Sequence, residues 1–241
     1  MRATGPMERF GGRAIVALEG GNMLHAVRVS MALLFTVSGG HAAAEKSPTI
    51  VIGFVGGMVR HDDRTHTEVQ LAENLRRDFP ESVYVAVFEN RRREAARREI
   101  RRRLGSHREG ARVILYGHSW GAASVVTLAR ELERDGIAVR LTVQVDSIRK
   151  FGQDDSVIPS NVSEAVNFYQ PRGMLRGRRE IRAADPERTQ ILGNYRIDYQ
   201  GSPIQCAEYP WHARVFAKPH IQIECDPGVW NRIEALIRSK L

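Results

Sequence analysis

The sequence predicts one α/β domain, a three-layer sandwich around a mostly parallel sheet of about five to six strands. From residue 47 onward, short apolar runs of strand length alternate with segments of helical periodicity. The runs at 49–55 and 112–116 are almost wholly apolar, which is typical of strands buried on both faces. The second run leads directly into Gly117-His118-Ser119-Trp120-Gly121 and then into a helix-competent segment, as in a strand–turn–helix unit.

The predicted elements follow one another with short connections. The first strand covers 49–55, and a helix follows over 67–79, where apolar residues recur at helical spacing before Pro80. The later elements are a strand over 83–88, an arginine-rich helix, a strand over 112–116, a helix over 122–135, strands over 139–145 and 165–169, and a C-terminal helix over 229–241. No periodicity is visible between 170 and 211, so this stretch is either a functional loop or conceals an element. We interpret 45–241 as one domain.

The net charge of +8 is concentrated in one segment. Ten arginines lie between Arg91 and Arg112, and Glu94 and Glu99 each precede arginines at helical spacing. This pattern is typical of a solvated helix surface. Aromatic residues that would stack on bases do not interleave with the run, so we expect no nucleic-acid partner. A basic interaction module is the alternative interpretation of this segment.

Residues 23–44 have the layout of a secretory signal peptide. Arg28 precedes an apolar run at 29–38, and small residues follow as far as Ala44. The run is too short to span a bilayer permanently, so we expect no membrane span in the mature chain. We expect translation to start at the first residue of this segment, residues 1–22 to be a non-native extension, and export to follow cleavage near Ala44. The alternative is a cytosolic N-terminal tail on a cytoplasmic protein.

The two cysteines, Cys206 and Cys225, both lie in the expected mature region. A disulfide between them would suit an exported protein. By closing a loop of about 20 residues, it would stabilise the fold by about 3 kcal/mol. Two unpaired buried thiols are the alternative.

The segment Gly117 to Gly121, set between strand and helix, resembles the nucleophile elbow of the α/β-hydrolase superfamily. The His-Ser pair within it is similar to that of many lipases, esterases and thioesterases. The resemblance covers roughly residue 49 to the C-terminus, although only the elbow is specific. It implies a serine nucleophile, here Ser119, with a histidine base and an acid in the chain order Ser, Asp or Glu, His. No separate lid segment precedes the elbow, so the implied fold is of the α/β-hydrolase type without a large lid domain.

Two histidines after the elbow, His212 and His220, are candidates for the base. In the superfamily the base lies on a loop just before the final helix. His220 is expected to occupy that place, because Asp226-Pro227-Gly228 starts the last helix. His212 is the alternative. His118, adjacent to Ser119, is expected to point elsewhere and to pack locally.

Asp146 is the expected acid. It ends the strand over 139–145, and open α/β sheets place ligand-handling residues at such strand ends. In most of the superfamily the acid follows the next strand, but here Gln170-Pro171-Arg172 follows it without a carboxylate. Some thioesterase-like members place the acid one strand earlier, as Asp146 would be. The alternatives in the irregular stretch are Asp185 and Asp198. Two further aspartates are interpreted as turn residues, Asp154 and Asp155.

The expected oxyanion hole combines the backbone N–H of Trp120 with one from the loop after the first strand. Val55 is favoured for the second donor by register with the family, and Gly56 is next. One departure from the family is that Gly53-Phe54 stands where many lipases have His-Gly. Losing one oxyanion donor typically costs about 2.7–4 kcal/mol of transition-state stabilisation.

Residues 61–66, His-Asp-Asp-Arg-Thr-His, resemble a group of metal ligands. Their spacing matches no specific site, so we interpret them as a polar loop over the active-site mouth. We expect neither a metal ion nor an organic cofactor.

These observations predict an exported serine hydrolase that cleaves a small carboxylic ester or thioester through an acyl-enzyme on Ser119. His220 would accept the serine proton and return it to the leaving group, and Asp146 would stabilise the imidazolium. The alternative is a non-catalytic binding protein on the same scaffold. Neither the acyl group nor the oligomeric state can be predicted from the sequence.

Overall fold

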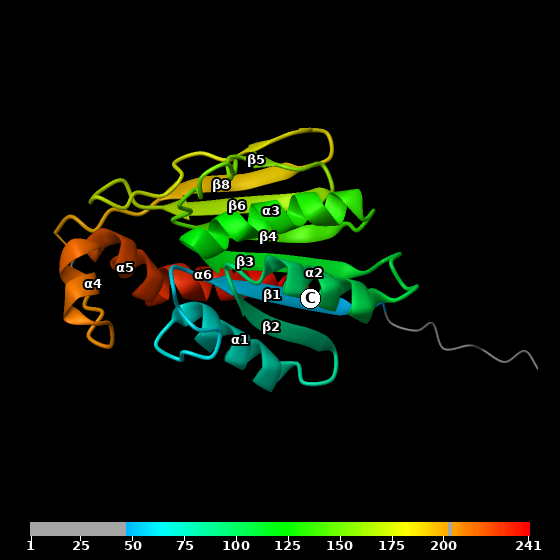
Figure 1. Cartoon of the computed structure of the whole chain (residues 1–241), viewed down its shortest axis with the longest axis horizontal. Coiled ribbons are helices and arrows are strands. Elements are labelled where there is room, and N and C mark those ends of the chain that lie inside the picture. Colours follow the sequence, from blue (N-terminus) through cyan, green and yellow to red (C-terminus); the bar gives the residue numbers. More distant parts are fainter. Residues whose placement is uncertain (1–46, 202–203) are drawn as a thin grey trace, which may run out of the picture. The chain divides into compact units, whose positions relative to one another are not determined.

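The computed structural model describes residues 47–201 and 204–241, so the expected extension at 1–22 and signal peptide at 23–44 lie outside the described residues. Its centre is a six-stranded sheet in the order β2-β1-β3-β4-β6-β8, with every neighbouring pair parallel (Figure 1). The strands of this sheet are β1 (Thr49–Val55), β2 (Val83–Glu89), β3 (Arg112–His118), β4 (Val139–Val145), β6 (Val162–Tyr169) and β8 (Gln190–Arg196).

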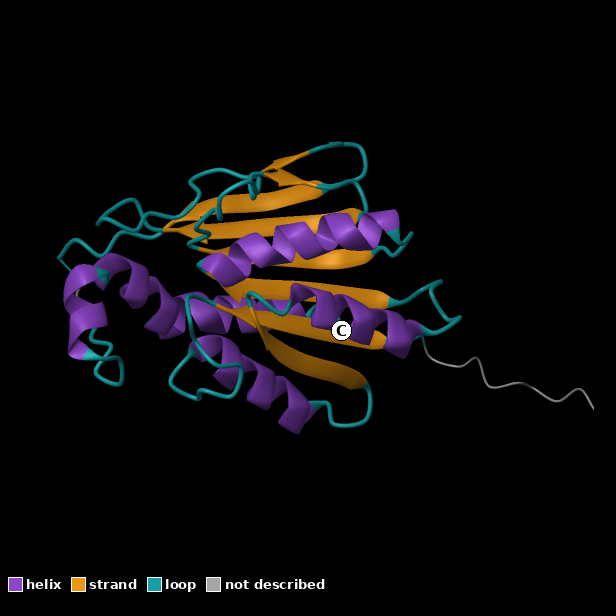
Figure 2. Cartoon of the chain, viewed as in Figure 1, coloured by secondary structure: helices purple, strands orange, loops and turns teal. Residues whose placement is uncertain are grey.

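Helices cover both faces of the sheet. Residues of α1 (Thr67–Asp78) and α6 (Pro227–Arg238) share one apolar core with the sheet. Residues of α2 (Arg93–Leu104) and α3 (Trp120–Arg134) share a second core on the other face, where Figure 2 shows both helices in front of the strands. Every residue of β1 is buried, because both of its faces are covered. The predicted three-layer α/β fold without a large lid is therefore confirmed for the described residues.

The strand register brings two of the predicted site residues to one edge of the sheet. Val145 at the end of β4 pairs with His118 of β3 and with Phe168 of β6. The residues that follow are held by the same ladder, since the N–H of Ser119 donates to the Val145 oxygen (2.9 Å) and that of Asp146 to the Phe168 oxygen (2.7 Å). Ser119 and Asp146 thus leave neighbouring strands at the same level.

The element predictions between 49 and 145 are confirmed to within a few residues, but the later ones are incomplete. The strand predicted over 165–169 begins at residue 162, and β8 lies in the stretch without a predicted element. β8 is an edge strand with mostly half-exposed or exposed residues, and its pairing shifts register next to Gly193. Such a strand lacks the apolar run by which a buried strand is predicted from the sequence. A separate two-stranded pair consists of β5 (Val157–Ile158) and β7 (Arg182–Ala183).

A disulfide encloses two short helices before the C-terminal helix. Cys206 and Cys225 are bonded, with their Cα atoms 5.9 Å apart, so the alternative of two free thiols is wrong. Between them lie α4 (Trp211–Phe216) and α5 (Lys218–Cys225). Neither helix was predicted, because six and eight residues are too few to establish a helical period.

The arginine-rich helix α2 is tied to its own acidic residues and to a neighbouring helix. Glu94 and Glu99 form the predicted ion pairs three and four positions along α2. In addition, Arg97 Nε donates to Asp135 Oδ2 (2.7 Å) just after α3. None of the helices in the described part of the chain has the length and apolarity needed to cross a bilayer.

Candidate active site

Ser119 occupies a tight turn between β3 and α3. Its φ of 57° lies in the left-handed region, which is strained for a residue with a side chain. The glycines on either side permit this turn, because a Cβ at Gly121 would lie 2.2 Å from the Phe54 oxygen and one at Gly117 2.7 Å from the Gly121 carbonyl carbon. The elbow that the motif predicts is therefore present, and it presents Ser119 at the edge of the sheet.

His220 connects Ser119 to Asp146. Its Nε2 lies 2.9 Å from Ser119 Oγ, and its Nδ1 lies 2.6 Å from Asp146 Oδ2. The ring is buried, with 4% of the residue exposed. The prediction that His220 lies on a loop is wrong, because it lies in the first turn of α5, where Pro219 at the helix start suits the fixed φ of proline.

Asp146 is completely buried, and both of its carboxylate oxygens accept hydrogen bonds. Besides His220, the donors are the backbone N–H (3.2 Å) and Nε2 (2.9 Å) of Gln170 and the backbone N–H of Gly177 (2.9 Å). These donors hold the carboxylate in one orientation. Asp146 also has a positive φ of 43°, so both it and Ser119 leave their strands through left-handed backbone.

The alternative site residues lie elsewhere. His212 is exposed on α4. Asp198 pairs with Arg172 at 3.0 Å on the surface, and the half-buried Asp185 accepts from the N–H of Glu187 within its own turn. The structure therefore brings Ser119 together with His220 and Asp146 and with none of these alternatives.

Gln170 and Gly177 were not predicted as site residues. Gln170 stands after β6, where most superfamily members would place the acid, and it donates to Asp146 instead of replacing it. A Cβ at Gly177 would lie 2.1 Å from Asp146 Oδ1, so this position has room only for glycine. No motif marks either residue. The absence of a carboxylate after β6 was, however, a signal that Gln170 could have a role there.

Asp155 does more than the turn role predicted for it. It is fully buried, accepts from Ser147 Oγ (2.6 Å) and forms an ion pair with Arg178. The Arg178 N–H donates in turn to the Ser147 oxygen (2.9 Å). Asp155 therefore links Ser147, which follows Asp146, to Arg178, which follows Gly177. Asp154 has the predicted turn role, accepting from the N–H of Ser156 (2.9 Å).

Of the expected oxyanion donors, Trp120 and Gly56 lie next to Ser119. Trp120 is the first residue of α3, so its N–H has no acceptor within the helix. A Cβ at Gly56 would lie 3.0 Å from Ser119 Cβ, which places this loop against the serine. Val55 lies within β1 and is fully buried, whereas Gly56 and Gly57 line the cavity beside Ser119.

A cavity of about 410 Å³ opens beside Ser119 and His220. This volume lies in the range of small-molecule sites, and the lining is predominantly apolar. Trp120, which is 38% exposed, also belongs to it. Further apolar lining residues are Val59, Ile148, Leu175, Pro210, Ala213 and Ile221.

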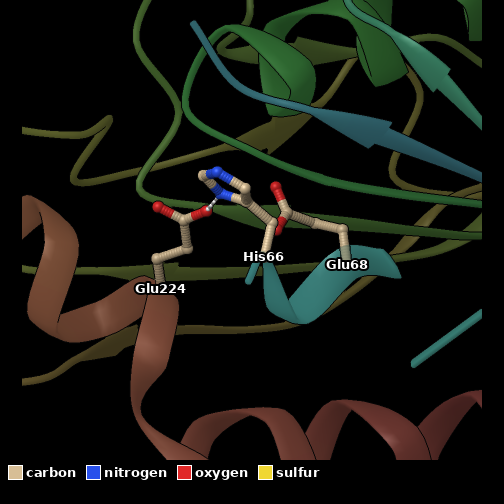
Figure 3. A group of neighbouring side chains, drawn as sticks. All are labelled: His66, Glu68 and Glu224. Atoms are coloured by element: carbon tan, nitrogen blue, oxygen red, sulfur yellow. Dashed lines mark hydrogen bonds and ion pairs between the residues drawn. The ribbon is translucent and has the colours of Figure 1, made fainter. Parts of the chain in front are cut away.

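A second group of ionisable side chains lies behind His220 and reaches the same cavity. The ring of His118 packs against that of His220 at a tilt of 34°, with centroids 4.4 Å apart, and its Nδ1 lies 3.3 Å from Glu224 Oε2. Glu224 also forms an ion pair with His66, and Glu68 lies beside this pair (Figure 3). His118 therefore points away from Ser119, as predicted, but its contacts are with charged groups.

Burial and mutual charge shift the pKa values in this second group. Burial lowers the pKa of His118 to about 4, and it raises the pKa of Glu68 well above its usual range, with the charge of Glu224 adding to the rise. Burial acts in the opposite sense on Glu224, but the charge of His118 and the hydrogen bond from His66 prevail and lower its pKa. The hydrogen bond to Glu224 likewise outweighs burial and raises the pKa of His66.

Comparison with known proteins gives likenesses of fold only. No family model and no curated protein matches the chain. Among solved structures, the thioesterase RedJ of the prodiginine pathway in Streptomyces coelicolor is 13% identical, with 83% of this chain and 96% of that chain covered and a TM-score of 0.43. A cutinase-like protein from Cryptococcus sp. is 13% identical over 80% and 94%, with a TM-score of 0.44, and an acetylxylan esterase is 10% identical over 80% and 99%, with a TM-score of 0.40. The α/β-hydrolase type of fold rests on the sheet order and the elbow of this chain.

Proposed function

We propose that the protein is an exported serine hydrolase that cleaves a carboxylic ester or thioester. The observation that carries the proposal is the continuous hydrogen-bonded chain from Ser119 Oγ through His220 to Asp146. A serine hydroxyl needs such a base to become a nucleophile. The base in turn needs an acid that fixes its tautomer, with the proton on Nδ1 and the lone pair of Nε2 directed at the serine.

The reaction follows from this arrangement. Ser119 Oγ attacks the carbonyl carbon while His220 Nε2 takes its proton, and Asp146 stabilises the imidazolium that forms. Collapse of the tetrahedral intermediate breaks the bond to the alcohol or thiol, which leaves with that proton. Water then attacks the acyl-enzyme by the same path, releasing a carboxylic acid and restoring Ser119.

The negative charge on the carbonyl oxygen would be held by backbone N–H groups. Trp120 supplies one from the free end of α3, where the helix dipole adds its positive end. For the second donor, the loop at Gly56 and Gly57 is better placed than Val55, because these glycines line the cavity.

The apolar cavity beside Ser119 favours an acyl group of short to medium length without charge. Its apolar lining includes Leu175 and Ile148, and the N–H of Ile148 donates to the backbone oxygen of Ser119 (3.2 Å). Burying each further methylene of a chain would contribute about 0.8 kcal/mol until the cavity is filled. We therefore expect the specificity constant to rise with chain length and then to fall.

The disulfide between Cys206 and Cys225 supports export, because such bonds persist in oxidising compartments. N-terminal sequencing of the native protein tests this part of the proposal. We expect a mature chain that begins near Glu45. A native chain that keeps residue 1 would contradict it.

The enzymatic part is tested with p-nitrophenyl esters and with acyl thioesters of increasing chain length. Replacing Ser119 by alanine should lower kcat about 10⁴-fold or more. Ser106→Ala, which changes an exposed serine outside the site, should leave it unchanged. A folded wild-type protein that hydrolyses none of these substrates, but binds them, would instead support the non-catalytic binding protein.

A further inference from the structure

Three side chains from two distant parts of the chain converge behind the candidate active site. His66 precedes α1, Glu68 lies in its first turn, and Glu224 lies near the end of α5. One ligand atom from each lies within 4.8 Å of the others. Figure 3 shows the His66 ring between the two carboxylates. His118 adds a nitrogen, because its Nδ1 lies 3.3 Å from Glu224 Oε2 and 4.0 Å from Glu68 Oε1.

The polar atoms of this group are incompletely paired. Glu68 is completely buried, and neither of its carboxylate oxygens has a hydrogen-bond partner among the described residues. Nε2 of the buried His118 is also without one. An unpaired buried polar group is costly, and an unpaired buried carboxylate much more so, so two such residues side by side require an explanation.

The charges are also unbalanced. Two buried carboxylates stand together, and the only described cationic partners in direct contact are the histidines. A divalent cation would neutralise both carboxylates at once and leave the histidines neutral, as metal ligands must be.

We propose that His66, Glu68 and Glu224 bind one divalent transition-metal ion, with Zn²⁺ as the preferred ion and His118 as a fourth donor. Imidazole nitrogen and carboxylate oxygen are both Zn²⁺ ligands, and a four-coordinate N₂O₂ set suits its tetrahedral preference. The ion can enter from the cavity, which His66, His118 and Glu224 line. This replaces the expectation that the protein binds no metal.

The proposed site is not the group of possible metal ligands seen in the sequence at residues 61–66. Of the 61–66 segment, only its last histidine takes part. His61 pairs with Glu89 at 2.8 Å, and Asp62 pairs with Arg60 at 2.9 Å, both outside the group. The remaining ligands come from α1, the end of β3 and α5, so no local spacing could reveal them.

The ion would act as a structural clamp. Glu224 lies one helical turn after His220 on α5, and the other ligands belong to the α1 region and β3. Binding would therefore fasten α5 to the body of the domain without touching Ser119. The site is independent of the proposed hydrolase activity, and its test uses no activity measurement.

The experiment measures metal content and thermal stability of the full chain. Protein stripped with a chelator is titrated with Zn²⁺, desalted, and analysed for bound metal, and its Tm is compared before and after loading. We expect about one Zn²⁺ per chain and a higher Tm, because a ligand that binds only the folded state stabilises it. Co²⁺ in place of Zn²⁺ should give the visible absorption of a four-coordinate site.

Matched variants locate the site. The single variants Glu68→Gln and His66→Gln should each bind Zn²⁺ at least roughly 10–100-fold more weakly. Loss of a residue that only supports a metal ligand already costs this much. His61→Gln, five positions away in the same loop, should bind as the wild type does. The proposal is overturned if the wild type retains no Zn²⁺ and its Tm does not change. It is also overturned if Glu68→Gln and His66→Gln both bind Zn²⁺ as tightly as the wild type.

Discussion

Two buried groups of charged side chains lie next to each other, and they differ in how well they are partnered. In the first, both oxygens of Asp146 accept hydrogen bonds, and both ring nitrogens of His220 have partners. In the second, neither carboxylate oxygen of Glu68 has a hydrogen-bond partner among the described residues, and Nε2 of His118 also lacks one. The rings of His118 and His220 pack against each other at a tilt, so the two groups are in direct contact.

This difference in partnering suits the two groups to different chemistry. A fully partnered group has one orientation, which is what proton transfer at a fixed oxygen requires. A group with unpaired buried atoms lacks partners within the protein, and its two carboxylates and two imidazoles offer the ligands that the proposed cation would bind. Both groups depend on α5, which carries His220 and Glu224.

The largest expected effect comes from removing the charge of the first group. Asp146→Asn should lower kcat about 10⁴-fold, because an amide in place of the carboxylate favours the wrong tautomer of His220. Hydrolysis of a short-chain p-nitrophenyl ester measures this, with circular dichroism to check folding. Asp154→Asn, in a surface turn, is the matched control. A loss below about tenfold in Asp146→Asn would show that this acid does not orient the base.

The next effect concerns the helix that both groups share. Replacing Cys206 and Cys225 by serine should lower the free energy of unfolding by about 3 kcal/mol, because the unfolded chain regains the freedom of the loop. For a domain of this size, Tm should fall by about 6–12 °C. Calorimetry of both proteins measures the change. Equal stability of variant and wild type would mean that this disulfide does not brace α5.

Gln170→Ala removes one of the donors to Asp146 and tests whether complete partnering matters. A hydrogen bond to a charged group contributes about 1.5–3 kcal/mol, so kcat should fall about 10–100-fold. KM should not change, because Gln170 does not line the cavity. Gln170→Glu should be at least as damaging, since it places a carboxylate against Asp146. Gln153→Ala is the control, and an equal effect there, or a rise in KM alone, would contradict a positioning role.

The smallest effect is expected in the second group. In metal-free protein, Glu68→Gln should leave the free energy of unfolding unchanged or raise it by no more than about 1 kcal/mol, because the carboxylate it replaces has no partner to lose. Urea unfolding in the presence of a chelator measures this. A loss above about 2 kcal/mol would mean that Glu68 is well partnered in solution, and the contrast between the groups would disappear.

The strands and helices could be predicted where a buried element has a regular pattern of apolar residues. β1 and β3 are largely apolar runs, and β4 alternates apolar and polar residues, as strands do. Ser119 follows the end of β3, and Asp146 follows the end of β4. β8 escaped prediction because an edge strand with exposed residues has no such run. His220 was found in the sequence, but its helix was not, because α5 has only eight residues.

The residues that contact the predicted site residues could not be predicted, for a different reason. Gln170 and Gly177 act through amide groups that any sequence could supply, so no motif marks them. Glu68 and Glu224 meet only because α1 and α5 are brought together by the fold. Contacts between residues more than a hundred positions apart have no local signature, so this site could not be predicted from the sequence.

The central claim is that Ser119 is activated by His220 and Asp146, and covalent labelling tests it most directly. The protein is incubated with a fluorophosphonate, and the adduct is located by intact mass and peptide mapping. We predict one adduct per chain, on Ser119, absent in Ser119→Ala and formed far more slowly in Asp146→Asn. A folded wild-type protein that remains unlabelled, or one labelled at another residue, would contradict the claim.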